Sequence, residues 1–219
     1  MTSVKQDCVV VTGFGLFCEH QANPSWDSIK DGRLQVDRPN IKLVTKQINV
    51  EYRAVDEQVK ELWRLHEPIL MVHVGLAAMT KNIRLERRAR HGPYIRDDVA
   101  QFAPHKQLEV IGDRSGQEEQ VKSLTQCASF ECSRTCVDID RLCERLNKLY
   151  ESSQAPLKFE CSNEAGLYVC EYIYQKSLRI CDRTVFIHVP DTSDEISLED
   201  IGKCLKLAIE TTLDELNAI

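Results

Sequence analysis

Three runs of consecutive apolar residues constrain this chain more than any other feature of its sequence. They are CVVVTG at Cys8–Gly13, ILMVHVG at Ile69–Gly75 and TVFIHV at Thr184–Val189, and each one stops at a glycine or just before a proline. Apolar, β-branched runs without polar alternation are typical of strands that are buried on both faces of a sheet. Because such a sheet needs helices over both faces, the runs predict an α/β fold.

The segments between these runs carry the spacing of helices. Apolar residues recur at helical intervals over Tyr52–His66, Ile139–Leu149, Val169–Leu178 and from Ile201 to Leu216, while Leu157–Cys161 reads as a further short strand. Asn23 before Pro24, and Ser197 before the last apolar series, are residues suited to the start of a helix. We therefore expect a three-layer α/β sandwich, with a largely parallel central sheet flanked by helices.

Nothing in the sequence divides the chain into parts, so we expect one α/β domain over residues 1–219. No internal repeat or Gly/Ser-rich linker interrupts the alternation of strands and helices. The stretch from Lys81 to Thr135 is less regular, and there we expect long loops or a hairpin.

The charge balance argues against two classes of partner. A formal net charge of −6 and a pI of about 5.6 do not suit a nucleic-acid binder, which needs a surplus of Lys and Arg on one face. No apolar stretch approaches the ~20 residues that span a bilayer, and the N-terminal residues lack the pattern of a signal peptide. We expect a cytoplasmic protein that binds neither nucleic acid nor membrane.

The chain has 10 cysteines, yet their spacing does not suggest a metal site. No CxxC occurs, and the four cysteines from 127 to 143 are irregularly spaced for zinc (Cys127, Cys132, Cys136 and Cys143). In a reducing compartment most cysteines persist as thiols, so we expect free thiols and no cofactor. A thiol redox protein or a zinc protein remains a competing interpretation.

One cysteine and one histidine stand where chemistry is expected. Cys170 lies near the start of an expected helix, where the helix dipole favours a thiolate, and His188 near the end of the last strand can accept its proton. Glu86 can orient the imidazole. The residues alone leave the alternatives open that Cys170 and His188 fill the core and that Glu86 pairs with the arginines around it.

Two phenylalanines flank the bend after the first strand. Phe14 and Phe17 stand in a glycine-bearing loop, where their rings can form a flat apolar slot for a small ring. They suit the core beneath that loop equally well.

Together these segments resemble the pyroglutamyl-peptidase I family, also called pyrrolidone-carboxylate peptidases. TGFGLFCEHQANPSW at Thr12–Trp26 is similar to the family's TGF-x-PF turn and its NPSW, and HVGLAAMTKNIRLERRA at His73–Ala89 resembles the segment that leads to the catalytic glutamate. SNEAGLYVCEYIYQKSL at Ser162–Leu178 matches the nucleophile motif AG-x-[YF]-x-C, and FIHVP at Phe186–Pro190 matches the histidine motif. The resemblance extends from Cys8 to about Leu213.

The resemblance implies hydrolysis of an N-terminal pyroglutamyl residue from peptides, through a thioester acyl-enzyme. Cys170 would be the nucleophile, His188 the general base and Glu86 the residue that orients it. Phe14, Phe17 and Tyr168 would line the slot for the pyrrolidone ring, and Asn23 would brace the loop.

Further contacts with substrate are implied less directly. Main-chain groups near Tyr168 and Val169 would bind the lactam, and Arg96 would join the backbone N–H of Cys170 at the oxyanion. The partners are peptides with N-terminal pyroglutamate, and the chain would act as a monomer or a homo-oligomer. The alternative is a non-catalytic pyroglutamyl-peptide-binding protein of the same fold.

The chain departs from the family pattern beside the slot. Leu16 replaces the usual proline between the two phenylalanines, so the turn is expected to be less rigid. Leu76 stands where many bacterial members have glutamine, which removes a polar contact.

Overall fold

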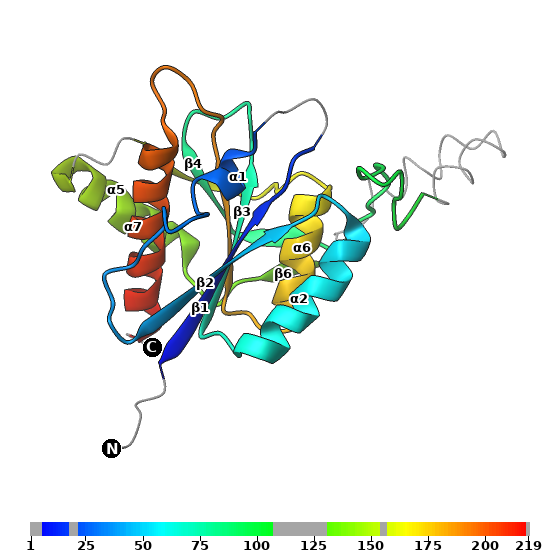
Figure 1. Cartoon of the computed structure of the whole chain (residues 1–219), viewed down its shortest axis with the longest axis horizontal. Coiled ribbons are helices and arrows are strands. Elements are labelled where there is room, and N and C mark those ends of the chain that lie inside the picture. Colours follow the sequence, from blue (N-terminus) through cyan, green and yellow to red (C-terminus); the bar gives the residue numbers. More distant parts are fainter. Residues whose placement is uncertain (1–5, 18–21, 107–130, 154–156, 218–219) are drawn as a thin grey trace.

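The computed structural model describes residues 6–17, 22–106, 131–153 and 157–217. Its centre is a six-stranded sheet in the order β2-β1-β3-β8-β4-β7 (Figure 1). β1, β2, β3 and β8 run parallel, whereas β4 is antiparallel to β8 and β7 is parallel to β4. In sheet order the strands are Ile41–Ile48, Asp7–Phe14, Leu70–Leu76, Thr184–Val189, Ile83–Glu86 and Phe159–Ser162.

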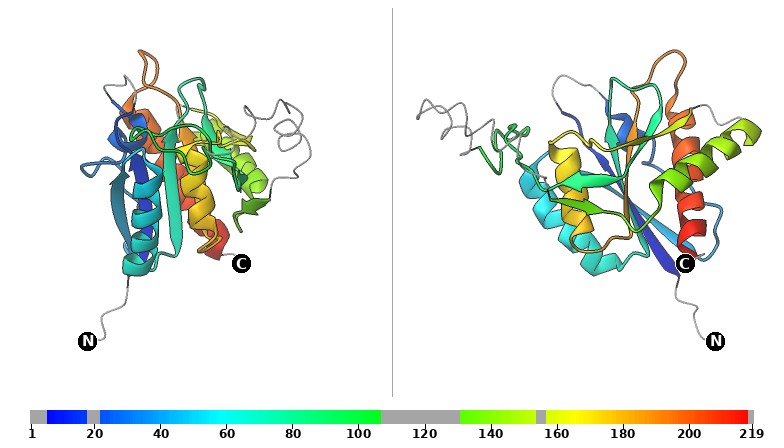
Figure 2. Two further views of the ribbon diagram at one scale, coloured as in Figure 1. Left: turned by 90° about the vertical axis from the view of Figure 1, so that its right-hand side faces the viewer. Right: turned by 180° about the vertical axis from the view of Figure 1, so that it is seen from behind.

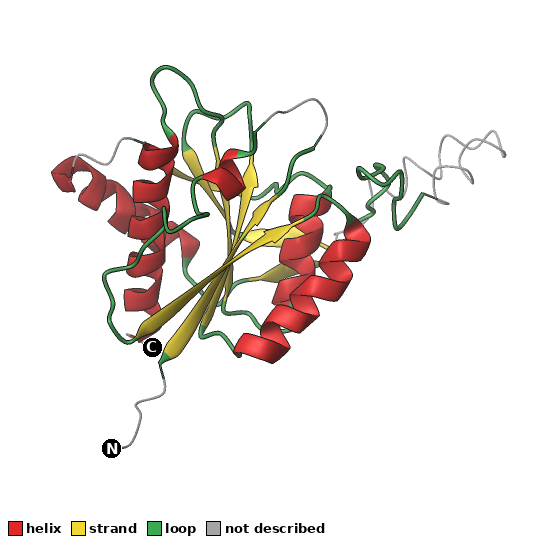
Figure 3. Cartoon of the chain, viewed as in Figure 1, coloured by secondary structure: helices red, strands yellow, loops and turns green. Residues whose placement is uncertain are grey.

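Helices cover both faces of this sheet, which confirms the expected three layers (Figure 3). One face packs against α2 (Tyr52–His66) and α6 (Val169–Leu178), and the other packs against α1 (Pro24–Asp27), α5 (Ile139–Ser153) and α7 (Leu198–Asn217). The buried strand residues alternate between these two cores, as their period of two requires. The apolar runs of the sequence are therefore the central strands of a sheet buried on both sides.

The three apolar runs form β1, β3 and β8, and the expected strand before the nucleophile forms β7. α2, α5, α6 and α7 are also where the apolar spacing predicts them. The helix at Asn23 is a single turn, α1. The backbone N–H of Ser25 donates to Oδ1 of Asn23 at 3.2 Å, so the Asn23 side chain caps the start of this helix. The apolar pattern does not predict β2, because this edge strand is largely half-exposed and its residues include Lys42, Thr45 and Lys46.

The irregular stretch between Lys81 and Thr135 contributes more order than expected. It contains β4 and two short strands, β5 (Arg88–Arg90) and β6 (Cys132–Arg134), which pair antiparallel. This small second sheet lies beside α6 in the view from behind (Figure 2). Its two strands are distant in sequence, so local turn signals could not reveal their pairing.

Several expectations concern residues that the structure describes only in part. Within the described ranges no helix is long and apolar enough to cross a membrane, and no three potential metal ligands gather. The eight cysteines of these ranges are free thiols. Cys127, in the cysteine-rich stretch, lies outside them.

One histidine is buried in the centre of the sheet. His73 on β3 has no exposed surface, and its Nδ1 lies 2.7 Å from the hydroxyl of Thr12. Its Nε2 has no hydrogen-bond partner among the described residues. Burial disfavours the imidazolium and lowers the pKa of His73 to about 3, so the ring is neutral in the fold.

This burial predicts loss of stability in acid. In the unfolded chain His73 binds a proton below its ordinary pKa of 6.5, whereas in the folded chain it binds one only below about pH 3. The free energy of unfolding therefore decreases as the pH is lowered from 6.5 towards 3. Between pH 7 and pH 5 the wild type should lose about 2 kcal/mol more free energy of unfolding than His73→Asn. Urea unfolding at both pH values measures this, with His66→Asn as control; equal losses in wild type and His73→Asn would contradict it.

Candidate active site

Cys170 is the second residue of α6, at the end of a turn that the backbone enters in a left-handed conformation. Gly166 has a φ of 105° and Leu167 a φ of 47°, and Tyr168 then begins the helix without a side-chain cap. The first N–H groups of a helix have no partner within it, so the backbone N–H of Cys170 is available to a ligand. The sequence prediction that Cys170 stands at a helix start is confirmed.

A buried ion pair holds this helix start in place. Glu171 has no exposed surface, and its carboxylate accepts hydrogen bonds from Nε and Nη2 of Arg90, both at 2.9 Å. It also accepts from the backbone amides of Arg90 at 2.9 Å and of Leu167 at 2.6 Å. With four donors the charge of Glu171 is satisfied, and the turn before Cys170 is tied to β5.

His188 and Glu86 form a second buried pair. The Nδ1–H of His188 donates to Oε1 of Glu86 at 2.8 Å, and Glu86 has no exposed surface. This bond leaves Nε2 of His188 as the unprotonated nitrogen of a neutral imidazole. Oε2 of Glu86 has no partner in the described part of the chain, so a protonated His188 is the cation that would best compensate its charge.

The arginines near Glu86 are paired elsewhere. Arg84 pairs with Glu160, Arg87 with Asp140 and Arg90 with Glu171. These three arginines therefore do not form ion pairs with Glu86, which contacts His188 instead. The alternative that Glu86 is a partner of its neighbouring arginines on a solvated face is wrong, because Glu86 is fully buried.

Gly75 allows the cysteine and the histidine to lie together. It is the register partner of His188 on the adjacent strand, and a Cβ added to it would lie 3.0 Å from Sγ of Cys170 and 2.8 Å from the ring of Phe186. The ring of Phe186 in turn packs 4.7 Å from that of His188. A side chain at position 75 would therefore push apart the groups that meet over it.

The surroundings of Cys170 favour the protonated form of its thiol. Burial and the carboxylates of Glu86 and Glu171 raise its pKa to about 12, against the lowering effect of Arg96. At neutral pH a thiolate consequently forms only when a base removes the proton. The neutral imidazole of His188 is suited to that role.

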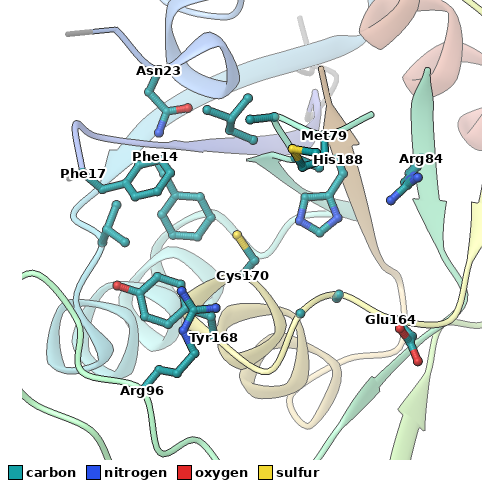
Figure 4. Close-up of a pocket in the computed structure, with 16 residues that line it drawn as sticks. Phe14, Phe17, Asn23, Met79, Arg84, Arg96, Glu164, Tyr168, Cys170 and His188 are labelled. Carbon is teal, nitrogen blue, oxygen red and sulfur yellow. The ribbon is translucent and has the colours of Figure 1, made fainter. Parts of the chain in front are cut away.

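A cavity of about 530 Å³ opens above these groups and is lined by both Cys170 and His188 (Figure 4). On one side it is walled by the rings of Phe14, Phe17 and Tyr168, and on the other by Arg84 and Glu164. The structure thus brings together the slot residues that the sequence analysis proposed.

Asn23 links the slot to α1. Its Nδ2 donates to the carbonyl of Gly15 at 2.8 Å, and its Oδ1 accepts from the hydroxyl of Ser25 at 2.8 Å. Because Gly15 lies between the two phenylalanines, this side chain braces the loop that carries them.

Of two other candidate residues, the side chain of Arg96 lines the cavity and that of Val169 does not. The guanidinium of Arg96 stacks over the ring of Tyr168 at 4.5 Å and lines the cavity. The side chain of Val169 is buried in the core between α6 and the sheet and does not line the cavity, so only its main chain can face a ligand.

Glu171 and Gly75 belong to the site but were not predicted from the sequence. A signal for Glu171 existed, since an acidic residue three positions after a helix cap commonly reaches back to a preceding amide. Gly75 ends an apolar run, and only the register with β8 reveals what its missing side chain permits.

The chain is similar to known proteins over most of its length. Residues 7–126 match the family model described as Pyroglutamyl peptidase. Pyroglutamyl-peptidase 1 of Homo sapiens is 31% identical over 209 residues, which cover 95% of this chain and 90% of that protein. Pyrrolidone-carboxylate peptidase of Thermosipho melanesiensis is 26% identical over 94% of this chain and 98% of its own.

Solved structures share the fold. Pyrrolidone carboxyl peptidase from Thermococcus litoralis superposes with a TM-score of 0.75 at 22% identity, over 97% of this chain and 96% of that one.

The close approach at Gly75 yields a prediction for Gly75→Ala. The added methyl group must displace Sγ of Cys170 or the ring of Phe186, which separates the thiol from its base. Alkylation of Cys170 by iodoacetamide at pH 7, mapped by mass spectrometry, should slow about tenfold or more. Gly202→Ala in α7, where the added Cβ meets only the carbonyl of Ser28 at 3.3 Å, is the control; an unchanged rate in Gly75→Ala would contradict the argument.

The buried pair of Glu171 and Arg90 predicts a large effect on stability. Glu171→Gln keeps the size of the side chain but leaves the charge of Arg90, whose side chain is only 16% exposed, without its partner. The free energy of unfolding should fall by about 3 kcal/mol, as measured by urea denaturation. Glu199→Gln breaks an exposed pair with Lys203 and should change little. Similar small effects for both variants would refute a stabilising role for the buried pair.

Proposed function

Since the chain belongs to the pyroglutamyl peptidase family, we propose that it removes N-terminal pyroglutamyl residues from peptides, with Cys170 as nucleophile. The observation that carries the proposal is the buried hydrogen bond of 2.8 Å between His188 and Glu86, beside a cysteine at a helix start. A nucleophile, a base and a residue that orients the base are the three parts that acyl transfer needs.

The first half of the reaction forms a thioester. Nε2 of His188 accepts the proton of the Cys170 thiol as sulfur attacks the pyroglutamyl carbonyl, and the carbonyl oxygen becomes an oxyanion. When the C–N bond breaks, the imidazolium gives this proton to the departing amine. Glu86 stabilises the imidazolium between these steps, because its carboxylate is buried against Nδ1.

The second half returns the enzyme to its starting state. His188 takes a proton from water as the water oxygen attacks the thioester carbonyl. The C–S bond then breaks, the sulfur regains a proton from the imidazolium, and free pyroglutamate leaves.

Two donors are proposed for the oxyanion. The backbone N–H of Cys170 is in the first turn of α6, where the helix dipole also favours negative charge. Arg96 is the second candidate, since its charge already lowers the pKa of the Cys170 thiol.

The slot accounts for the choice of substrate. The lactam of pyroglutamate is uncharged, and Phe14, Phe17 and Tyr168 offer apolar ring faces to it. The main chain near Tyr168 and Val169 supplies polar partners for its N–H and C=O. An N-terminal glutamine or glutamate carries a charged amine that would be unpaired against these rings, so it should be rejected.

A thiol nucleophile must remain reduced in order to act, so we propose that the enzyme acts in the cytoplasm. The proposed partners are peptides that begin with pyroglutamate.

Hydrolysis of a pyroglutamyl aryl amide under reducing conditions tests the proposal. Wild type should release the amine and leave a prolyl aryl amide intact, whereas Cys170→Ala should be inactive and Glu86→Gln should lose about a hundredfold or more in kcat. Cys136→Ala, which removes an exposed thiol, is the matched control and should keep full activity.

An inactive, folded wild type would refute catalysis. Binding of the amide without turnover would instead favour the non-catalytic binding protein.

A further inference from the structure

The cavity has a second side that the pyroglutamyl ring does not use. Phe14 and Phe17 lie on one side of Cys170 and His188, and Arg84 and Glu164 lie on the opposite side (Figure 4). If the ring occupies the aromatic side, the scissile carbonyl lies at Sγ of Cys170, and the leaving peptide must extend past His188. The part of the cavity near Arg84 is therefore where the first residue of the leaving peptide lies.

Arg84 is placed next to the base by the sheet itself. It is the register partner of His188 on the antiparallel strand β4, two residues before Glu86. Residues two apart in a strand point to the same face, so Arg84 stands on the same side of the sheet as Glu86 and closer to the cavity mouth. The register thus places Arg84 next to His188 along the sheet, at the wall of the cavity.

The guanidinium is anchored on one edge only. Its Nε donates to Oε1 of Glu160, whose carboxylate also accepts from Asn82 at 3.3 Å and Thr80 at 3.3 Å. Within the part of the chain that the structure describes, neither terminal nitrogen of Arg84 has a hydrogen-bond partner. Arg84 is thus oriented by a fixed carboxylate and lines the cavity, with its terminal N–H groups as donors for a ligand.

These donors fit a planar oxygen acceptor better than a second charged side chain. Glu160 already balances the charge of Arg84, and the carboxylate of Glu164 lies on the same side of the cavity, so the local charge does not favour an acidic side chain. A carbonyl oxygen needs only the donors. Every leaving peptide carries such an oxygen on its first residue, whatever its side chain.

We propose that Arg84 is a specificity residue that binds the main-chain carbonyl oxygen of the first residue of the leaving peptide. The inference rests on the proposed function. Arg84 thereby favours peptides over simple pyroglutamyl amides, without selecting the next side chain.

Two substrates separate this role from catalysis itself. Pyroglutamyl-alanine amide has the carbonyl group in question, and a pyroglutamyl aryl amide lacks it. In Arg84→Met the ratio of kcat/KM for the alanine amide to that for the aryl amide should fall about tenfold, the expected effect of one hydrogen bond to a charged donor. Arg84→Lys should restore part of the ratio, because an ammonium group donates but lacks the planar fork.

The controls keep the outcomes distinct. Arg33→Met changes an exposed arginine that does not line the cavity, and it should leave the ratio of the two kcat/KM values unchanged. The pair of Arg84 and Glu160 is partly exposed, with side chains 41% and 37% accessible, so its loss should not unfold the protein.

An equal loss for both substrates in Arg84→Met would show that Arg84 acts on His188 rather than on the leaving peptide, and no loss for either substrate would exclude the contact. In both cases the ratio stays unchanged, which overturns the inference. A wild type that hydrolyses neither substrate would refute the proposed function and the inference with it.

Discussion

The hydrogen bond between His188 and Glu86 is the interaction on which the candidate site depends. A carboxylate with no exposed surface is costly to bury unless a partner compensates it, and here the partner is the imidazole at 2.8 Å. The bond requires β4 to lie against β8 in the antiparallel register that places Glu86 beside Phe186. The reversed direction of β4, which β7 shares, relative to the parallel strands β1, β2, β3 and β8 is therefore tied to the chemistry.

Around this pair, the charges of Glu171 and Arg84 have partners of their own. Glu171 is held by Arg90 and fastens the turn before Cys170, while Glu160 holds Arg84 at the cavity wall. The pair of Glu171 and Arg90, at the start of the helix that carries Cys170, is less exposed than the pair of Arg84 and Glu160 at the cavity wall. The pair that holds the turn before the thiol is thus shielded from solvent, whereas the pair at the outer part of the cavity is closer to solvent, where a leaving peptide would have to be accommodated.

The sequence patterns predicted the elements well where burial was complete. β1, β3 and β8 have no polar alternation because both of their faces are covered, and α2 and α5 show clear apolar stripes. β2 was not predicted, because an edge strand with polar residues lacks a continuous apolar run. The pairing of β5 with β6 joins segments far apart in the chain, and no local signal specifies a contact of that kind.

By itself the sequence determined the fold class, the position of Cys170 at a helix start and the family to which the chain belongs, because these depend on local periodicity, capping and motif spacing. Only the tertiary structure decided between the two interpretations of Glu86, as the partner of His188 or of the arginines near it, because the sheet register buries Glu86 against His188 while the arginines pair elsewhere. The same holds for Gly75, whose missing side chain matters only because β3, β8 and α6 meet there. Contacts between distant segments are set by packing, and packing is a property of the whole chain rather than of any stretch of it.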